Sequence, residues 1–185
     1  MAQTNEEFDQ ASARCREIFA KKLKDYGASW RLMRPESVTD QLLIKANRIR
    51  CLEVKKEAWV NEGIQPEYMA IVNYGAVALI QCERSFADIV DMEAEEALAS
   101  YDKYIKASTE LMHDKNHDYD EAWRLMRTSS YTDVILVKLQ RIKEIEDHHG
   151  RTSVSEGVES NYMDIINYAL FALIKLAEAE EQEEK

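Results

Sequence analysis

Basic side chains recur at matched positions in the two halves of this chain, where they could bind a phosphate. Lys45 and Arg48 lie three residues apart, as do Lys138 and Arg141, so each pair shares one face of a helix. Ammonium and guanidinium groups on one face can hold a phosphate, with arginine donating two parallel hydrogen bonds. We therefore predict a cationic phosphate site, to which three further residues are assigned: Arg31, Lys115 and Arg124.

The same charges have a purely structural interpretation. A repeated network of ion pairs can join two like units without any ligand. The acids that would take part are Asp25, Asp40, Asp118 and Asp133. The sequence leaves both interpretations open.

Two asparagines interrupt apolar segments and suggest a second set of candidates. Asn73 follows Val72 and Asn167 follows Ile166, each in the middle of a predicted helix. A buried amide must find hydrogen-bond partners or cost roughly 1–3 kcal/mol. Either the asparagines make hydrogen bonds between helices or they contact a ligand. Trp123 is added to the nucleotide-binding candidates because an indole can stack on a base, although aromatic side chains are more often buried anchors.

Carboxylates in the second half could hold a metal. Asp164 lies in a mostly apolar helix, and we predict that it binds Mg²⁺ together with Glu146 and Glu159. The corresponding position in the first half is Ala70, so the first half lacks this ligand. At most one such metal site is therefore expected. Acids near helix ends are also common on solvated faces.

The chain is an internal duplication. Asp25-Tyr26 and Trp30-Arg31-Leu32-Met33-Arg34 return 93 residues later as Asp118-Tyr119 and Trp123-Arg124-Leu125-Met126-Arg127. Halves of this size have little room for independent cores. We predict an all-α helical bundle of two tandem three-helix repeats, 1–90 and 91–185, that share one core and are related by a pseudo-two-fold axis.

The predicted helices follow the apolar periodicity. In the first repeat they cover about 6–24, 37–57 and a segment from 66, and in the second about 93–113, 130–147 and a segment from 160. Ser37 and Ser130 are predicted N-caps, each with an acid three residues later. The third helix of each repeat is apolar nearly all round and should be central. The link 82–93 is expected to be a tight turn near Asp88 or one continuous bent helix.

Composition and charge narrow the class of protein. The 185 residues carry a net charge of −11, which opposes binding along a nucleic-acid backbone. Three cysteines without CxxC spacing and a polar, acidic start favour a reduced, cytoplasmic protein without a signal peptide. The longest apolar stretch, 165–176, is too short and polar to span a membrane. A homo-oligomer is compatible with the sequence.

The repeated motif resembles the nucleotide modification associated domain 1 family of bacteria and phages. Copy 2 carries it in the order Lys115, Asp118, Tyr119, Trp123, Asp133, Lys138, Arg141, Ile142, Asp164, Asn167 and Tyr168. Copy 1 carries Lys22, Asp25, Tyr26, Trp30, Asp40, Lys45, Arg48, Ile49, Ala70, Asn73 and Tyr74. The resemblance covers most of both halves and implies a tandem member of a nucleotide-associated family.

A more distant resemblance is to the all-α nucleoside triphosphate pyrophosphohydrolases of the MazG type. That resemblance implies acids in ExxE and ExxD motifs that bind Mg²⁺ against a triphosphate. Here 67–70 keeps only the first acid, 161–164 keeps only the last, and 144–147 is approximate. The leading hypothesis is binding, or Mg²⁺-dependent hydrolysis, of a nucleoside triphosphate at the cleft between the repeats. The rival is a non-catalytic interaction or scaffold protein with a decayed site.

Overall fold

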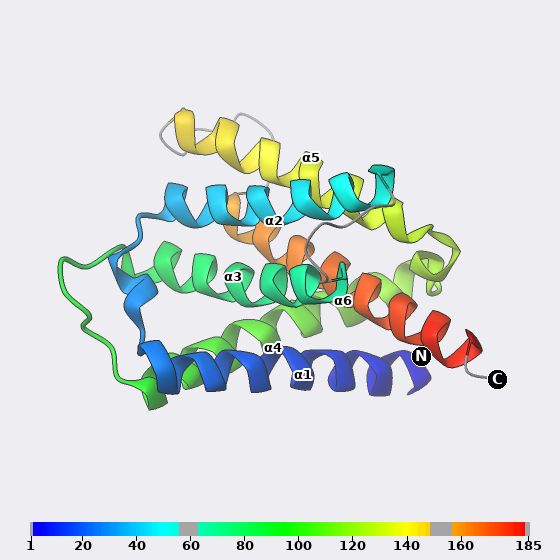
Figure 1. Ribbon diagram of the computed structural model, residues 1–185, viewed down its shortest axis with the longest axis horizontal. Helices are drawn as coiled ribbons and strands as arrows, with labels where there is room; N and C mark the ends of the chain where they lie inside the picture. The colour runs from blue at the N-terminus through cyan, green and yellow to red at the C-terminus, as the bar shows by residue number, and fades with distance from the viewer. Residues whose placement is uncertain (1, 56–62, 149–156, 184–185) are drawn as a thin grey trace.

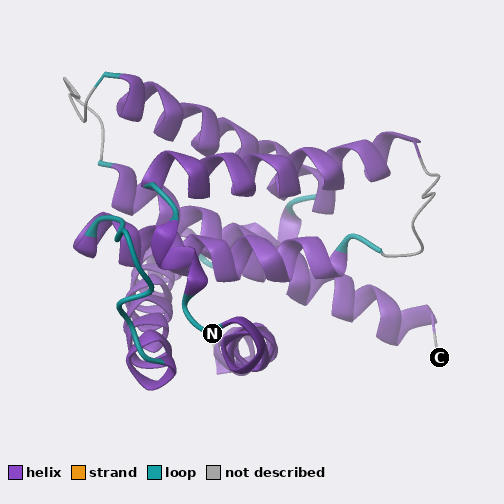
Figure 2. Ribbon diagram, turned by 60° about the vertical axis from the view of Figure 1, so that its left-hand side comes forward, coloured by secondary structure: helices purple, strands orange, loops and turns teal. Residues whose placement is uncertain are grey.

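The described part of the protein is entirely helical apart from its loops. The computed structural model describes residues 2–55, 63–148 and 157–183, which contain no strand (Figure 2). The first repeat contains α1 (Ala2–Tyr26), the 3₁₀ helix η1 (Ser29–Leu32), α2 (Pro35–Lys55) and α3 (Gln65–Arg84). The second contains α4 (Ala94–Tyr119), η2 (Ala122–Leu125), α5 (Thr128–Asp147) and α6 (Val158–Glu183). The predicted all-α class is confirmed.

The helices form three layers, with α3 and α6 in the middle. Figure 1 shows α2 and α5 on one side of this pair and α1 and α4 on the other. The middle helices pack chiefly on each other and on both outer layers. A helix covered on several sides must be apolar nearly all round. Both are therefore central, as the sequence predicts, and buried residues of the two repeats form one continuous core.

Gly75 allows the two middle helices to approach closely. A Cβ atom at this position would lie 2.7 Å from Cγ1 of Ile166 on α6. The equivalent residue in the second repeat is Ala169, so the small residue recurs while the glycine does not. The crossing of α3 and α6 depends on this absence of a side chain.

Reciprocal hydrogen bonds join α2 and α5 across the repeats. Thr39 donates a hydrogen bond to Glu146 at 2.6 Å, and its hydroxyl lies 2.6 Å from the hydroxyl of Tyr162. Burial raises the pKa of the Glu146 carboxyl, and the hydrogen bond from Thr39 opposes this shift. The equivalent set is formed by Thr132, Glu53 and Tyr68. Such a reciprocal pair is what a pseudo-two-fold relation between the repeats would produce.

Two ion pairs flank this contact and are also reciprocal. Lys143 lies 2.5 Å from Asp40, and Arg50 lies 3.9 Å from Asp133. The structural interpretation of these two acids is therefore correct, although their partners are not the basic residues considered from sequence. Each pair is largely exposed, so its contribution is small, roughly 0–1 kcal/mol.

The predicted N-caps are wrong in both repeats. Helix α2 begins at Pro35 and α5 at Thr128, so Ser37 and Ser130 lie inside the first turn. Proline suits the first helical position because its fixed φ is helical and its missing N–H would have no partner there. The periodicity marked the helices correctly, but the capping pattern placed their starts two residues late.

Residues 85–93 form a loop, which is neither a tight turn nor a continuous helix. Ser85 ends α3 with a φ of 62°, and the Ala87 N–H donates a hydrogen bond to the Arg31 carbonyl at 2.9 Å. The loop therefore folds back onto η1.

All three cysteines are free. Among the described helices, none combines the length and apolar character needed to cross a membrane.

Candidate functional site

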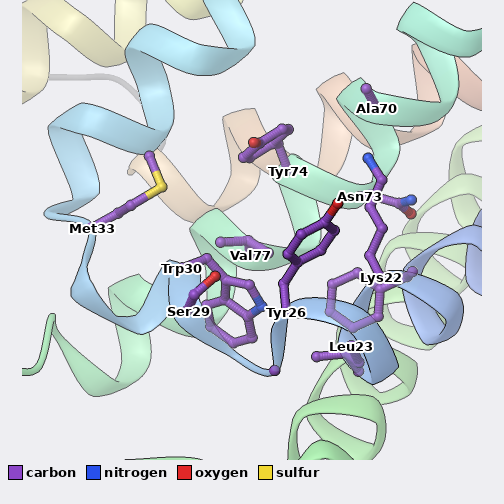
Figure 3. Close-up of a pocket in the computed structure, with 12 residues that line it drawn as sticks. Lys22, Leu23, Tyr26, Ser29, Trp30, Met33, Ala70, Asn73, Tyr74 and Val77 are labelled. Carbon is purple, nitrogen blue, oxygen red and sulfur yellow. The ribbon is translucent and has the colours of Figure 1, made fainter. Parts of the chain in front are cut away.

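Each repeat contains a pocket between its first helix, its 3₁₀ helix and its third helix. The repeat-1 pocket has a volume of about 430 Å³ and the repeat-2 pocket about 390 Å³. Figure 3 shows the repeat-1 pocket, which is lined in part by Lys22, Tyr26, Trp30, Ala70, Asn73 and Tyr74. The equivalent lining of the repeat-2 pocket is Lys115, Tyr119, Trp123, Asp164, Asn167 and Tyr168. The two pockets are thus copies of one arrangement.

The predicted position of the site between the repeats is not supported. Those predicted nucleotide-binding residues that line a pocket do so within one repeat, because each pocket is built by three elements of the same repeat. A separate cavity between α1 and α4 contains none of the predicted residues. Some of the predicted residue types therefore line pockets, and each of these pockets lies within one repeat.

A shared turn positions the aromatic residues. Helix α1 ends at Tyr26, and Gly27 follows in the left-handed region with a φ of 58°. Helix α4 ends at Tyr119, and Asp120 adopts a φ of 49°. Glycine and aspartate are residue types that tolerate this conformation after a helix. The turn brings the 3₁₀ helix, and with it the tryptophan, back beside the tyrosine.

The two tyrosines at the pocket rims are unusually open. Tyr26 is 71% exposed and Tyr119 is 70% exposed. Figure 3 shows Tyr26 beside Trp30, with Tyr74 on the facing helix. An exposed aromatic ring at the mouth of an aromatic pocket is available to contact a flat ligand.

In the repeat-2 pocket, the acid is held by two lysines. Lys115 and Lys138 each donate a hydrogen bond to a different oxygen of Asp164, both at 2.6 Å. The Asp164 side chain is only 8% exposed. Opposite charges at this distance satisfy the buried carboxylate. Lys138, a predicted phosphate ligand, is therefore engaged by the protein itself.

In the first repeat, the corresponding acid lies one helical turn earlier, beside the pocket. Glu67 accepts a hydrogen bond from Arg48, and its other oxygen lies 3.3 Å from the Lys45 ammonium. Its side chain is 4% exposed, and it does not line the pocket. Lys22 lines the pocket instead, and in Figure 3 its side chain extends past Asn73 toward α3. Lys45 and Arg48 thus bind Glu67 beside the pocket.

Arg31 is buried and holds the loop 85–93 rather than facing a ligand. Its guanidinium donates hydrogen bonds to Gln81, to the Ser85 carbonyl and to Asp91, the last at 2.8 Å. The hydrogen bond from Arg31 lowers the pKa of the Asp91 carboxyl, and burial opposes this shift. The prediction that Arg31 binds phosphate has no support in this geometry.

Arg124 is also engaged in structural contacts. Its guanidinium donates hydrogen bonds to Glu7, Glu121 and Glu178, at 2.5, 3.0 and 2.7 Å. The same guanidinium lies 4.3 Å from the ring centre of Trp123. Arg124 therefore ties α1 and α6 to η2.

The remaining basic candidate lies outside the pockets. Arg141 lies 3.4 Å from Glu144 on the same helix, in an exposed pair. The structure therefore does not bring Arg141 together with Lys115 and Asp164 at the repeat-2 pocket.

Both asparagines form hydrogen bonds between helices and also line the pockets. The Asn73 side-chain oxygen accepts a hydrogen bond from the Tyr101 hydroxyl at 2.8 Å, and the Asn167 amide donates to the Ser108 carbonyl at 2.8 Å. The structural interpretation is therefore correct for each. Among the described residues, the buried Asn167 side-chain oxygen has no hydrogen-bond partner, and neither do the buried indole N–H groups of Trp30 and Trp123.

The three predicted metal ligands do not come together. Both oxygens of Asp164 accept hydrogen bonds from lysines, Glu146 binds Thr39 at the α2–α5 contact, and Glu159 is exposed. Within 2–55, 63–148 and 157–183, no group of three or more histidine, cysteine or acidic side chains could hold a metal ion. Because a cation would have to displace two ammonium groups at Asp164, this set of donors does not fit Mg²⁺.

Several residues that line the pockets are not among the predicted site residues. They are Lys22, Tyr26, Trp30, Tyr74, Tyr119 and Tyr168. All of them belong to the repeated motif and recur between the repeats. Recurrence was therefore the signal that could have identified them.

Comparison with known proteins agrees with the duplication. The family model described as nucleotide modification associated domain 1 matches residues 22–82 and again residues 115–176. No curated protein and no solved structure matches the chain. The matched segments cover most of the chain and nearly all of the residues that line the two pockets. The chain therefore belongs to the nucleotide modification associated domain 1 family, as a tandem pair of its domains.

Proposed function

We propose that this protein binds a nucleotide, with the base against the aromatic wall of a pocket and the phosphate beside a lysine. The observation that carries the proposal is the repetition of one pocket design. A lysine, two tyrosines, a tryptophan and an asparagine line both pockets at equivalent positions. Many other residues differ between the two repeats, whereas this pocket-lining set has stayed the same.

The chemistry of the lining suits a nucleotide. Stacking of a base on an aromatic side chain contributes roughly 1–3 kcal/mol and tolerates every base. The Lys22 ammonium supplies a point charge for a phosphate.

The size of the pockets agrees with this class of ligand. Volumes of about 430 and 390 Å³ lie within the range of roughly 300–1,000 Å³ that small-molecule sites occupy. The name of the family, which refers to nucleotide modification, supports the same class.

The proposal is limited to binding. Hydrolysis of a triphosphate by a metal-activated water needs a cluster of acids. Asp164 is engaged by lysines, Glu146 is engaged by Thr39, and Glu159 is exposed. Magnesium therefore enters the test only as an added ion.

Isothermal titration calorimetry with nucleoside 5′-monophosphates and triphosphates of each base, with and without Mg²⁺, tests the proposal. We expect binding that weakens in Trp30→Phe and in Lys22→Gln. Product analysis of the same mixtures would detect hydrolysis. If no nucleotide binds at any concentration up to the millimolar range, the proposal is wrong and the scaffold interpretation gains support.

A further inference from the structure

The two pockets carry different free charge, although they share one design. In the repeat-2 pocket, Asp164 occupies Lys115 and Lys138 together, at 2.6 Å each. In the repeat-1 pocket, Ala70 replaces that acid. Within the described residues, the Lys22 side chain makes no hydrogen bond and no ion pair, and it lines the pocket. One pocket therefore presents an unneutralised ammonium group, and the other does not.

The displaced acid of the first repeat explains why this charge stays free. Glu67 lies one helical turn before Ala70 and pairs with Lys45 and Arg48 beside the pocket. The equivalent of Glu67 in the second repeat is Asn161, which donates to the Gly157 carbonyl at 2.9 Å and carries no charge. The acid has thus moved by three residues along equivalent helices. Because of this difference, Lys115 is neutralised by an acid, whereas the equivalent Lys22 is not.

The tryptophans of the two pockets also differ in how far their rings are covered, and this difference again favours binding in the repeat-1 pocket. Trp123 is 5% exposed, and its ring is covered by Phe171 at 4.4 Å and by the Arg124 guanidinium at 4.3 Å. Trp30 is only partly buried, and its nearest aromatic contact is the tilted ring of Phe19 at 6.4 Å. A base can therefore reach the tryptophan ring more readily in the repeat-1 pocket.

We infer that the repeat-1 pocket binds the phosphate-bearing nucleotide and that the Asp164 carboxylate excludes anions from the repeat-2 pocket. The Asp164 carboxylate accepts hydrogen bonds from the two lysines that an anionic ligand would need, so it occupies the position of a phosphate. The inference rests on the proposed function and gives it a stoichiometry of a single nucleotide per chain. The specificity-determining positions are Ala70 and Asp164, with Glu67 and Asn161 one turn before them.

Exchanging these positions between the repeats tests the inference. Variant E67N/A70D gives the repeat-1 pocket the charges of the other copy, and N161E/D164A does the reverse. Calorimetry with adenosine 5′-monophosphate and thymidine 5′-monophosphate measures affinity and stoichiometry. We expect affinity to fall roughly tenfold or more in E67N/A70D, because the new carboxylate would neutralise the Lys22 ammonium and repel a phosphate. We expect a second binding site per chain in N161E/D164A.

Single charge-neutralising variants keep the test decisive if an exchange variant fails to fold. Lys22 and Lys115 are both partly or fully exposed, so glutamine should be tolerated at either position. Lys22→Gln should weaken binding of the monophosphates more than Lys115→Gln does. Adenosine and inorganic phosphate, titrated separately, show which part of the nucleotide each variant affects.

The outcomes separate the two proposals. If the wild-type protein binds two monophosphates per chain, or if Lys115→Gln abolishes binding while Lys22→Gln does not, the inference is wrong and the proposed function stands. Binding that survives unchanged in E67N/A70D also overturns it. If neither the wild type nor any variant binds any of these probes, the proposed function fails and the inference fails with it.

Discussion

The two repeats differ in the charge pairing at their pockets, but they make equivalent hydrogen bonds at the contact between α2 and α5. At that contact, Thr39 with Glu146 and Thr132 with Glu53 make the same hydrogen bonds in both directions. In the pockets, an acid has moved by one helical turn and changed which lysine is free. The duplicated scaffold thus keeps reciprocal packing contacts, whereas positions at its pockets differ between the repeats.

The equivalent residues Arg31 and Arg124 should differ most in their contribution to stability. Arg31→Leu removes a guanidinium whose side chain is 3% exposed, and it leaves Gln81 and the Ser85 carbonyl without a donor. We expect a loss of about 3 kcal/mol in the free energy of unfolding. Arg124→Leu should cost less, about 1–2 kcal/mol, because Arg124 is 25% exposed and water can solvate its acids. Urea denaturation measures both, and equal losses would contradict the assignment.

Removal of the Asp164 carboxylate should cost somewhat less. Asp164→Ala leaves Lys115 and Lys138 close together without an acid, and we expect a loss of about 2 kcal/mol, reduced because Lys115 is 46% exposed. The matched change Ala70→Asp should have little effect on stability, since Lys22 can pair with the new acid. Added inorganic phosphate should partly restore Asp164→Ala in a thermal-unfolding assay. If phosphate stabilises the wild type equally, Asp164 does not occupy an anion position.

The tryptophans should separate ligand binding from packing. Trp30→Phe is expected to weaken nucleotide binding by roughly three- to tenfold, because a smaller ring offers less stacking area. Trp123→Phe should leave binding unchanged but lower the free energy of unfolding by about 1 kcal/mol, through its contacts with Phe171 and Arg124. Calorimetry and chemical denaturation of both variants check this. If Trp123→Phe changes the affinity and leaves the free energy of unfolding unchanged, the packing role of Trp123 is wrong.

The smallest expected effects are at the reciprocal contact, where the repeats should behave alike. Burial raises the pKa of both Glu53 and Glu146, so the folded state binds more protons than the unfolded state between the ordinary and the raised pKa. Stability from these groups is complete below the ordinary pKa of glutamate and decreases as the pH rises through the raised value. Glutamine at either position should remove this decrease and still accept from the threonine. Thermal melts across this pH range that differ between E53Q and E146Q would contradict the equivalence.

Much of the architecture could be predicted from the sequence, whereas the site was only partly predictable. Periodicity identified the helices, and the duplication identified the equivalence of the repeats. Helix starts were misplaced because Pro35 and Thr128 extend each second helix by two residues. The loop 85–93 was missed because its position depends on the distant Arg31. Of the predicted phosphate ligands, Arg31 and Arg124 are engaged in structural contacts, which no spacing within the sequence could indicate.

The sequence by itself determined that this is a duplicated all-α protein with recurring lysine, asparagine and aromatic positions. Those features depend on local spacing, and local spacing fixes the face of a helix. Only the tertiary structure decided which charges neutralise one another. An ammonium group pairs with the nearest acid in space, and a shift of one helical turn, from Asp164 to the Glu67 position, redirects that pairing. The free charge of each pocket is therefore a property of the packed helices.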